Sequence, residues 1–272
     1  MRLITIPAHN PGPYTGAGTN TYFLPGQVPV LIDAGTGDAR HLEGVAGAIA
    51  DSDAPGLASV LVTHGHVDHA SGAPALAARW PSVTFAKWPD RSDAGSGITW
   101  RALHDDQLVP AGDTALWVVH TPGHARDHVC FFEPHTGVLF AGDLVVKGGT
   151  VVVPASYGGS LAQYLASLRR ILELRPRRIL PGHGTAIDHP AALLRAYIAH
   201  RLAREQQILE ALAHGPRDVP ALVAAIYKGL DDGLRGAAAE SVLAHLHKLR
   251  DEGHVTAEPE DAVPQVWRVA GR

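Results

Sequence analysis

Short runs of apolar residues, bounded by glycine, proline or aspartate, recur along the first two thirds of the chain. Runs of this length are typical of buried β-strands. We predict strands at residues 28–32, 59–63, 83–86, 115–120, 138–141 and 178–180. Apolar residues at helical spacing between several of these runs predict helices over residues 39–50, 72–79 and 160–174, the last with Ser160 as N-cap. This alternation predicts an α/β fold with mixed sheets.

The pattern changes after Pro190, where strand-like runs give way to a long stretch rich in Ala, Leu, Arg and Glu. We predict helices over residues 191–214, 218–227 and 240–250, followed by strand-like segments at 253–257 and 265–269. Three helices followed by a β-hairpin is the element order of a winged helix. We therefore divide the chain into an α/β domain, residues 1–190, and a helical, winged-helix domain, residues 191–272.

Composition excludes several classes of protein. Of the 272 residues, 46% are hydrophobic and 18% are charged, which is typical of a globular chain and not of a disordered or fibrous one. The net charge of −4 provides no overall basic field that would attract nucleic acid or an anionic membrane. No stretch approaches the roughly 18 uninterrupted apolar residues of a membrane helix, and the N-terminus has no long apolar segment.

The single cysteine, Cys130, excludes an intramolecular disulfide and any multi-cysteine metal site. It lies within an apolar run, residues 129–132, and we interpret it as a core residue. A chain that holds together without disulfides fits a reducing compartment. We therefore expect a cytoplasmic protein that does not associate with membranes.

Histidine is unusually frequent, with 17 residues, and one cluster carries the candidate chemistry. Residues 63–69 read Thr-His-Gly-His-Val-Asp-His and follow a predicted strand. Side chains two apart in an extended chain point the same way, so His64 and His66 can bind one ion. A helix starting at Asp68 would direct Asp68 and His69 toward a second ion.

Three further candidate ligands, His124, Asp143 and His183, each follow the end of a predicted strand and stand beside a glycine. The carboxyl ends of strands in an α/β sheet are where loops converge to form a site. Four separate loops would thus bring five histidines and two aspartates to one cavity. Imidazole and carboxylate ligands suit zinc, and iron or manganese are also compatible with them.

The spacing His64-x-His66-x-Asp68-His69, with the three later ligands, resembles that of the metallo-β-lactamase superfamily of binuclear hydrolases. Residues 10–13, 18–22, 31–35 and 204–209 are similar to the lactamase-beta-2-like branch, whose members carry a C-terminal winged helix. The resemblance implies a four-layer αββα sandwich with a catalytic site for two zinc ions. It places His64, His66 and His124 on the first metal, Asp68, His69 and His183 on the second, and Asp143 between them.

The reaction implied by the resemblance is attack of a metal-bridging hydroxide on an electrophilic centre. Asp68 is the candidate catalytic residue, because a carboxylate beside that hydroxide can pass a proton to the leaving group. A role for Asp68 as a ligand alone is equally compatible with the sequence. The best-known zinc β-lactamases use a cysteine ligand where this chain has Asp143, so we do not expect a true β-lactamase.

Three functions remain open from the sequence. We favour hydrolysis of a small ester, thioester or lactone, because residues 201–272 contain 9 basic and 11 acidic residues and the expected recognition helix offers only Lys248 and Arg250. The first alternative is an endoribonuclease that cleaves single-stranded RNA, as the resemblance also allows. The second is a nucleic-acid-binding regulator with a vestigial hydrolase domain. We expect the winged helix to pack against the catalytic domain, where it would shape the cleft or a homodimer.

Two residues near the ligands have a structural interpretation. Asp33 follows a predicted strand, and we expect it to hold the metal-binding loop through hydrogen bonds. His128 lies four residues after His124 and is either a support for the ligands or a histidine satisfied by its own surroundings.

Overall fold

The computed structural model describes residues 1–90, 97–215, 217–258 and 265–271. Its first sheet has six strands in the order β1-β2-β3-β4-β5-β6. These strands are β1 (Ile4–Pro7), β2 (Asn20–Leu24), β3 (Val30–Ile32), β4 (Ser59–Leu61), β5 (Thr84–Lys87) and β6 (Trp100–Ala102). The pairs β1·β2 and β2·β3 are antiparallel, whereas β3, β4, β5 and β6 run parallel to one another.

The second sheet has five strands in the order β11-β10-β9-β8-β7. They are β7 (Leu108–Ala111), β8 (Thr114–His120), β9 (Val129–Glu133), β10 (Val138–Gly142) and β11 (Arg178–Pro181). Only the pair β10·β11 is parallel in this sheet; the other neighbours are antiparallel. Of the strands that precede candidate ligands, β4 lies inside the first sheet, and β8, β10 and β11 lie in the second, with β9 between β8 and β10.

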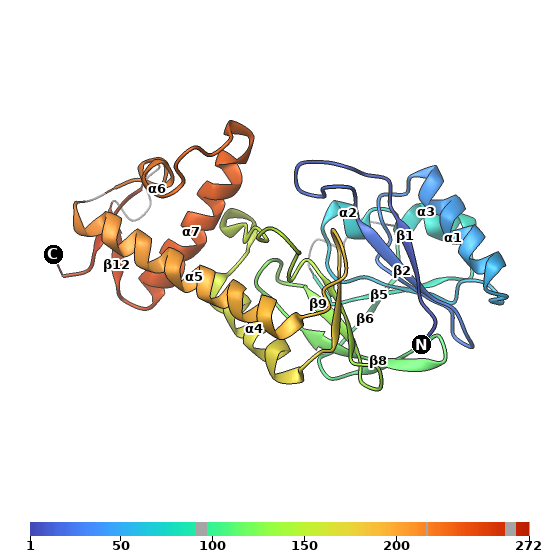
Figure 1. The fold of residues 1–272 in the computed structure, drawn as a ribbon. Coiled ribbons are helices and arrows are strands. Elements are labelled where there is room, and N and C mark those ends of the chain that lie inside the picture. The colour runs from blue at the N-terminus through green and yellow to red at the C-terminus, as the bar shows by residue number, and fades with distance from the viewer. Residues whose placement is uncertain (91–96, 216, 259–264, 272) are drawn as a thin grey trace.

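Helices cover the outer face of each sheet (Figure 1). They are α1 (Ala39–Asp51), α2 (Val67–Ala70) and α3 (Ala73–Arg79) beside the first sheet, and α4 (Leu161–Leu174) and α5 (Pro190–Ala213) beside the second. Ser160 caps α4 as predicted, since its side chain accepts a hydrogen bond from the Gln163 N–H.

Three apolar cores separate these layers. Alternate residues of β3 face opposite ways: Ile32 lies between the two sheets with Phe131 and Phe140, while Leu31 packs outward against Val45 of α1. A third core lies between the second sheet and helices α4 and α5. The order helix, sheet, sheet, helix confirms the predicted four-layer αββα sandwich.

The C-terminal part folds around its own core, which includes Ile208, Val242 and Trp267. Its elements after α5 are α6 (Val219–Ile226), the 3-10 turn η3 (Asp232–Leu234), α7 (Arg235–Asp251), β12 (Val255–Glu258) and β13 (Val266–Val269). The two strands pair antiparallel, which confirms the winged helix. None of the helices in the described part of the chain is long and apolar enough to span a membrane.

Helix α5 belongs to two cores at once. Leu194 and Tyr197, near its start, pack with the second sheet and α4, whereas Ile208 and Leu212 pack with the winged helix. The division of the chain after residue 190 therefore stays a prediction. Helix α7 also touches α4 and the short turn η2 (Ala155–Tyr157), so the winged helix packs against the α/β part, as the sequence led us to expect.

Several elements differ from the expectations. Strands β1, β2, β6, β7 and β9 carry no separate strand prediction. Helix α2 begins at Val67, one residue before the expected start, and α7 begins at Arg235 instead of residue 240. The first turn of α7 holds glycine and small alanines and therefore shows no apolar spacing. The loop between the hairpin strands, residues 259–264, lies outside the described residues.

Candidate metal centre

Four loops deliver the seven predicted ligands to one place. They follow β4, β8, β10 and β11, the strand ends at which ligands were expected. The ligands fall into two groups, and within each group the ligand atoms all lie within 4.8 Å of one another. The first group is His64, His66, His124 and Asp143, and the second is Asp68, His69 and His183.

Asp143 lies between the two groups. Its Oδ2 is 3.5 Å from His124 Nε2 and 4.0 Å from His64 Nε2. Its Oδ1 is 3.4 Å from His69 Nε2 and 3.3 Å from His183 Nε2. One carboxylate thus presents a different oxygen to each group of nitrogens.

In the first group, His66 lies close to both other histidines. Its Nδ1 lies 2.9 Å from the Nε2 atoms of both His64 and His124. Three ring nitrogens therefore converge on one point, as expected for three histidine ligands of a single cation. In the second group, Asp68 Oδ2 lies 3.2 Å from His69 Nε2 and 3.3 Å from His183 Nε2.

The ring nitrogens that face away from the centre have partners of their own. Thr63 Oγ1 is 3.0 Å from His64 Nδ1, and the Val152 carbonyl is 2.7 Å from His124 Nδ1. Because these outer nitrogens of His64 and His124 are engaged, their Nε2 atoms are left to face the centre, whereas His66 faces it with Nδ1.

Asp33 holds the metal-binding loop, as predicted. Its carboxylate accepts hydrogen bonds from the Thr63 N–H at 2.7 Å and the Thr63 hydroxyl at 3.1 Å, and it lies 2.7 Å from His69 Nδ1. It adopts the left-handed conformation, with φ of 65°, a conformation that aspartate tolerates better than most residues.

His128 supports a ligand from behind. Its Nε2 accepts a hydrogen bond from the Asp143 N–H at 3.1 Å. The proton of the ring is then on Nδ1, 2.8 Å from Thr121 Oγ1. Of the two readings left open by the sequence, the structure favours a support for the ligand set.

Two features of the centre were given no role by the sequence analysis. Thr19 is fully buried, and its hydroxyl donates to Asp68 Oδ2 at 2.8 Å. Beneath Gly65, the buried Lys87 Nζ lies 3.0 Å from Asp127 Oδ2. A Cβ at Gly65 would stand 3.0 Å from the same oxygen, which explains a glycine between the two histidines.

Burial sets the charge of the first group. It lowers the pKa of His64 well below the usual value, and burial together with His124 lowers the pKa of His66 to about 4. Both rings are therefore neutral near pH 7, the form that binds cations.

In the second group, the pKa of His183 is shifted in the opposite direction, upward. Burial alone would lower the pKa of His183, but hydrogen bonds with Asp143 and Asp68 outweigh burial and raise its pKa to about 9. The two carboxylates thus favour positive charge beside them, which a divalent cation also provides.

The donor set fits a pair of divalent cations. His69 Nε2 is buried and makes no hydrogen bond among the described residues, although Asp68 and Asp143 oxygens lie 3.2 and 3.4 Å away. An unpaired buried nitrogen aimed at two carboxylates is typical of a ligand atom. Imidazole nitrogens and carboxylate oxygens are ligands of zinc, iron and manganese.

Helix α5 fixes the segment between β10 and α4 that borders the centre. The Tyr197 hydroxyl donates to the Val146 carbonyl at 2.8 Å and accepts from its N–H at 3.0 Å. The buried Arg201 donates to the Val151 carbonyl and to Thr150 Oγ1. Helix α5 therefore holds the chain next to Val152, whose carbonyl contacts His124.

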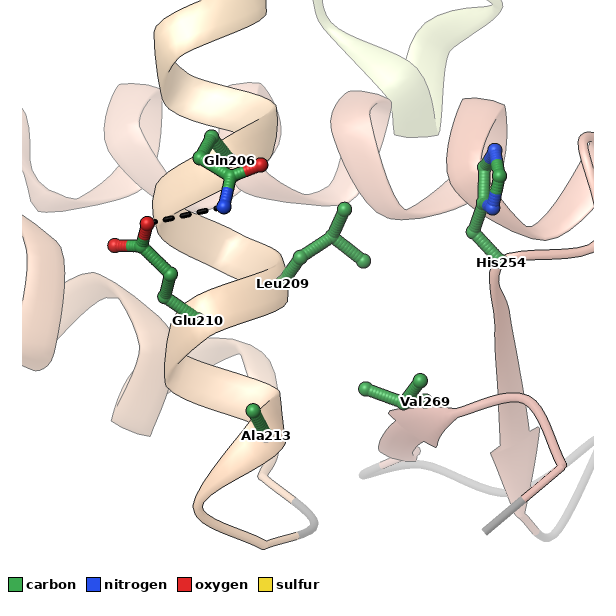
Figure 2. A pocket seen from close by; sticks show the side chains of 6 residues that line it. All are labelled: Gln206, Leu209, Glu210, Ala213, His254 and Val269. Carbon is green, nitrogen blue, oxygen red and sulfur yellow. Dashed lines mark hydrogen bonds between the residues drawn. The ribbon is translucent and has the colours of Figure 1, made fainter.

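A separate hollow of about 330 Å³ lies in the winged-helix part (Figure 2). It is lined by Gln206, Leu209, Glu210, Ala213, His254 and Val269. None of the seven candidate ligands lines it, so it has no part in the chemistry of the centre.

Comparison with known families agrees with the geometry. Residues 14–183 match the model of the metallo-beta-lactamase superfamily, and residues 219–267 match the beta-lactamase associated winged helix domain. The chain belongs to the metallo-β-lactamase superfamily, a superfamily of hydrolases.

Relatives match this chain over most of their own length. Beta-lactamase-like protein 2 homolog of Drosophila melanogaster is 34% identical over 264 residues, which cover 92% of this chain and 88% of the relative. This similarity supports the branch suggested by the sequence. Atrochrysone carboxyl ACP thioesterase nsrC of Aspergillus novofumigatus is 31% identical over 271 residues, 93% of this chain and 80% of the relative.

A solved structure shows the same fold over nearly the whole chain. The beta-lactamase domain protein from Burkholderia ambifaria superposes with a TM-score of 0.83. The match is 24% identical and covers 99% of this chain and 91% of that chain.

Proposed function

We propose that this protein is a binuclear metal-dependent hydrolase that uses water to cleave a small ester, thioester or lactone. The observation that carries the proposal is the position of Asp143, whose Oδ1 and Oδ2 face two separate groups of imidazole nitrogens. A carboxylate shared in this way suits two cations held side by side.

The proposed ligands follow the two groups. His64, His66 and His124 would hold one cation, Asp68, His69 and His183 the other, and Asp143 both. Zinc is the proposed metal, with iron or manganese compatible with the same donors. The chemistry that two bound cations supply is a more acidic water and polarisation of the substrate oxygen that gains negative charge.

The protein's own residues would then handle the proton. The water oxygen bonds to the acyl carbon, the bond from that carbon to the leaving sulfur or oxygen breaks, and the leaving atom receives a proton. We assign this proton, which the attacking water gives up, to Asp68 Oδ1, because the other oxygen, Oδ2, faces His69 and His183.

An acyl substrate is favoured over RNA by two observations. One relative is named as an ACP thioesterase. Of the two cations on the expected recognition helix, Lys248 is already paired with Glu205 and Glu252, at 2.9 and 2.8 Å. A phosphate backbone needs a row of available cations, which this helix does not offer.

The proposed location is the cytoplasm. The support for it is Cys130, which is buried within the core and paired with no other cysteine, as is usual for a reducing compartment.

The test is a substrate panel on zinc-loaded protein: an acyl thioester, a lactone and a fluorescently quenched single-stranded RNA. Asp143→Asn, loaded and purified identically, controls for contaminating activity. We expect turnover of an acyl substrate that falls at least about 100-fold in the variant. Cleavage of RNA alone, lost in the variant, would replace the proposal by the ribonuclease.

A further inference from the structure

The loop between β1 and β2, residues 8–19, reaches over the side of the first sheet where α2 lies (Figure 1). Its last residue, Thr19, is fully buried and lies 2.8 Å, Oγ1 to Oδ2, from Asp68. The sequence analysis used residues 10–13 and 18–22 only for the family resemblance and assigned them no role. Their contacts in the structure indicate a role.

The direction of the hydrogen bond between Thr19 and Asp68 is fixed by Asn10. The Thr19 N–H donates to Asn10 Oδ1 at 2.8 Å, so this atom of the amide must be the oxygen. The amide nitrogen, Nδ2, then donates to Thr19 Oγ1 at 2.9 Å. A hydroxyl has one proton, so Thr19 must donate it to Asp68 Oδ2.

The same segment also holds His183. Asn20 Nδ2 donates to the carbonyls of Pro181 and Gly184 at 3.1 and 2.9 Å, and the Asn20 N–H donates to the Gly182 carbonyl at 2.7 Å. These three bonds clamp the loop on both sides of His183.

The contacts of Thr19 and Asn20 thus lie at the second group of ligands, although Thr63 and Asp33 link the two groups. The side chains of Thr19 and Asn20 donate hydrogen bonds to Asp68 and to the His183 loop, in the second group. The first group is held instead by Thr63 at His64 and by the Val152 carbonyl at His124.

We propose that Asn10 and Thr19 are positioning residues that hold Asp68 Oδ2 as an acceptor and thereby set the affinity of the second cation subsite alone. The proposal rests on the proposed function, because it needs two cations. Because Oδ2 accepts the hydrogen bond from Thr19, we assign a proton transferred during the reaction to Oδ1. The metal ligand and the proton carrier are then different oxygens of one carboxylate.

The test is titration of metal-free protein with Zn²⁺, followed by calorimetry, for wild type, Thr19→Val and Thr19→Ser. We expect Thr19→Val to bind the first equivalent as wild type does and the second about 10- to 100-fold more weakly. Thr19→Ser retains the hydroxyl and should bind the second equivalent within about 3-fold of wild type, by the same argument.

Two further variants separate positioning from stability. Asn10→Asp replaces a donor by an acceptor, so the Thr19 proton should turn toward residue 10 and the second equivalent should weaken as in Thr19→Val. Thr21→Val removes the neighbouring buried hydroxyl, which lies 2.8 Å from His41 Nε2, and should bind both equivalents normally even where its melting temperature falls.

The outcomes distinguish this inference from the proposed function. Unchanged binding by Thr19→Val, or equal weakening of both equivalents, would overturn the positioning role. Binding of the second equivalent by Thr19→Ser as weakly as by Thr19→Val would also overturn it. Wild type that binds fewer than two equivalents would overturn both proposals, whereas wild type that binds two and hydrolyses no acyl substrate would overturn the proposed function only.

Discussion

Replacing Asp33 by Asn should switch the proton of His69 from one ring nitrogen to the other. In the native protein, Thr63 N–H donates to Asp33 Oδ1 at 2.7 Å, and Oδ2 lies 2.7 Å from His69 Nδ1. The asparagine oxygen must stay with the Thr63 N–H, because this donor is buried and a side-chain oxygen at position 33 is its acceptor. The amide nitrogen then faces His69 Nδ1.

The consequence reaches the metal centre through the ring. An amide nitrogen donates, so His69 Nδ1 must accept and the ring proton moves to Nε2. That atom faces Asp68 and Asp143 at 3.2 and 3.4 Å and would no longer offer a lone pair. Loss of such an outer partner costs about 10- to 100-fold in metal affinity, or about 1.4 to 2.7 kcal/mol.

The assay is calorimetric titration of metal-free Asp33→Asn with Zn²⁺. Asparagine tolerates the left-handed conformation of position 33, with φ of 65°, so the backbone should not be strained. Asp218→Asn is the matched control: it removes one carboxylate in the winged helix and can still cap α6 at Ala221. Wild-type affinity for both equivalents in Asp33→Asn would refute the tautomer argument.

Three further changes have defined outcomes. Burial alone would raise the pKa of Glu133, but hydrogen bonds from the following turn outweigh burial and lower this pKa from 4.5 to about 2. Chemical denaturation should therefore show Glu133→Gln less stable than wild type by about 1–2 kcal/mol at neutral pH, and this difference should disappear as the pH falls from 4.5 toward 2. Gly182→Ala places a methyl group 2.7 Å from Asp143 Oδ1 and should weaken Zn²⁺ binding at least about 10-fold. The control Gly47→Ala, whose methyl group would have no atom within 4 Å, should bind Zn²⁺ normally, and equal binding by the two variants would contradict the steric argument. Arg201→Met removes the donor to a buried carbonyl and should lower the free energy of unfolding by about 1–3 kcal/mol, while an unchanged melting temperature would mean that this contact is dispensable.

The ligand set could be predicted because its signals are local. His64 and His66 stand two apart in an extended segment, and His124, Asp143 and His183 each follow a strand end beside a glycine. Both strand ends and glycines are visible in the order of residues alone. The metal role of these residues stays a prediction until cations are measured.

The supports of the centre could be predicted only in part, because the sequence predicts that Asp33 holds the metal-binding loop but leaves His128 between two readings and gives Thr19 no role. Thr19 and Asp68 are 49 positions apart, and their contact depends on how the β1–β2 loop folds over α2. His128 accepts from the backbone N–H of Asp143, a donor that every residue type except proline would provide. No periodicity in the chain records either contact.

The missed strands have a related cause. Strand β6 has three residues, two of them exposed, and β7 alternates exposed and buried positions beside its neighbour β8. Such strands are defined by pairing with a distant segment more than by their own apolar content. The winged helix was predictable because its helices and hairpin are neighbours in sequence.

The central claim is tested most directly by adding Zn²⁺ stepwise to metal-free wild type while following the bound metal and the hydrolysis of an acyl thioester in the same samples. The account predicts two equivalents per chain and turnover that rises chiefly with the second. Full turnover with one equivalent, or two equivalents retained by Asp143→Asn at wild-type affinity, would contradict a binuclear centre shared through Asp143.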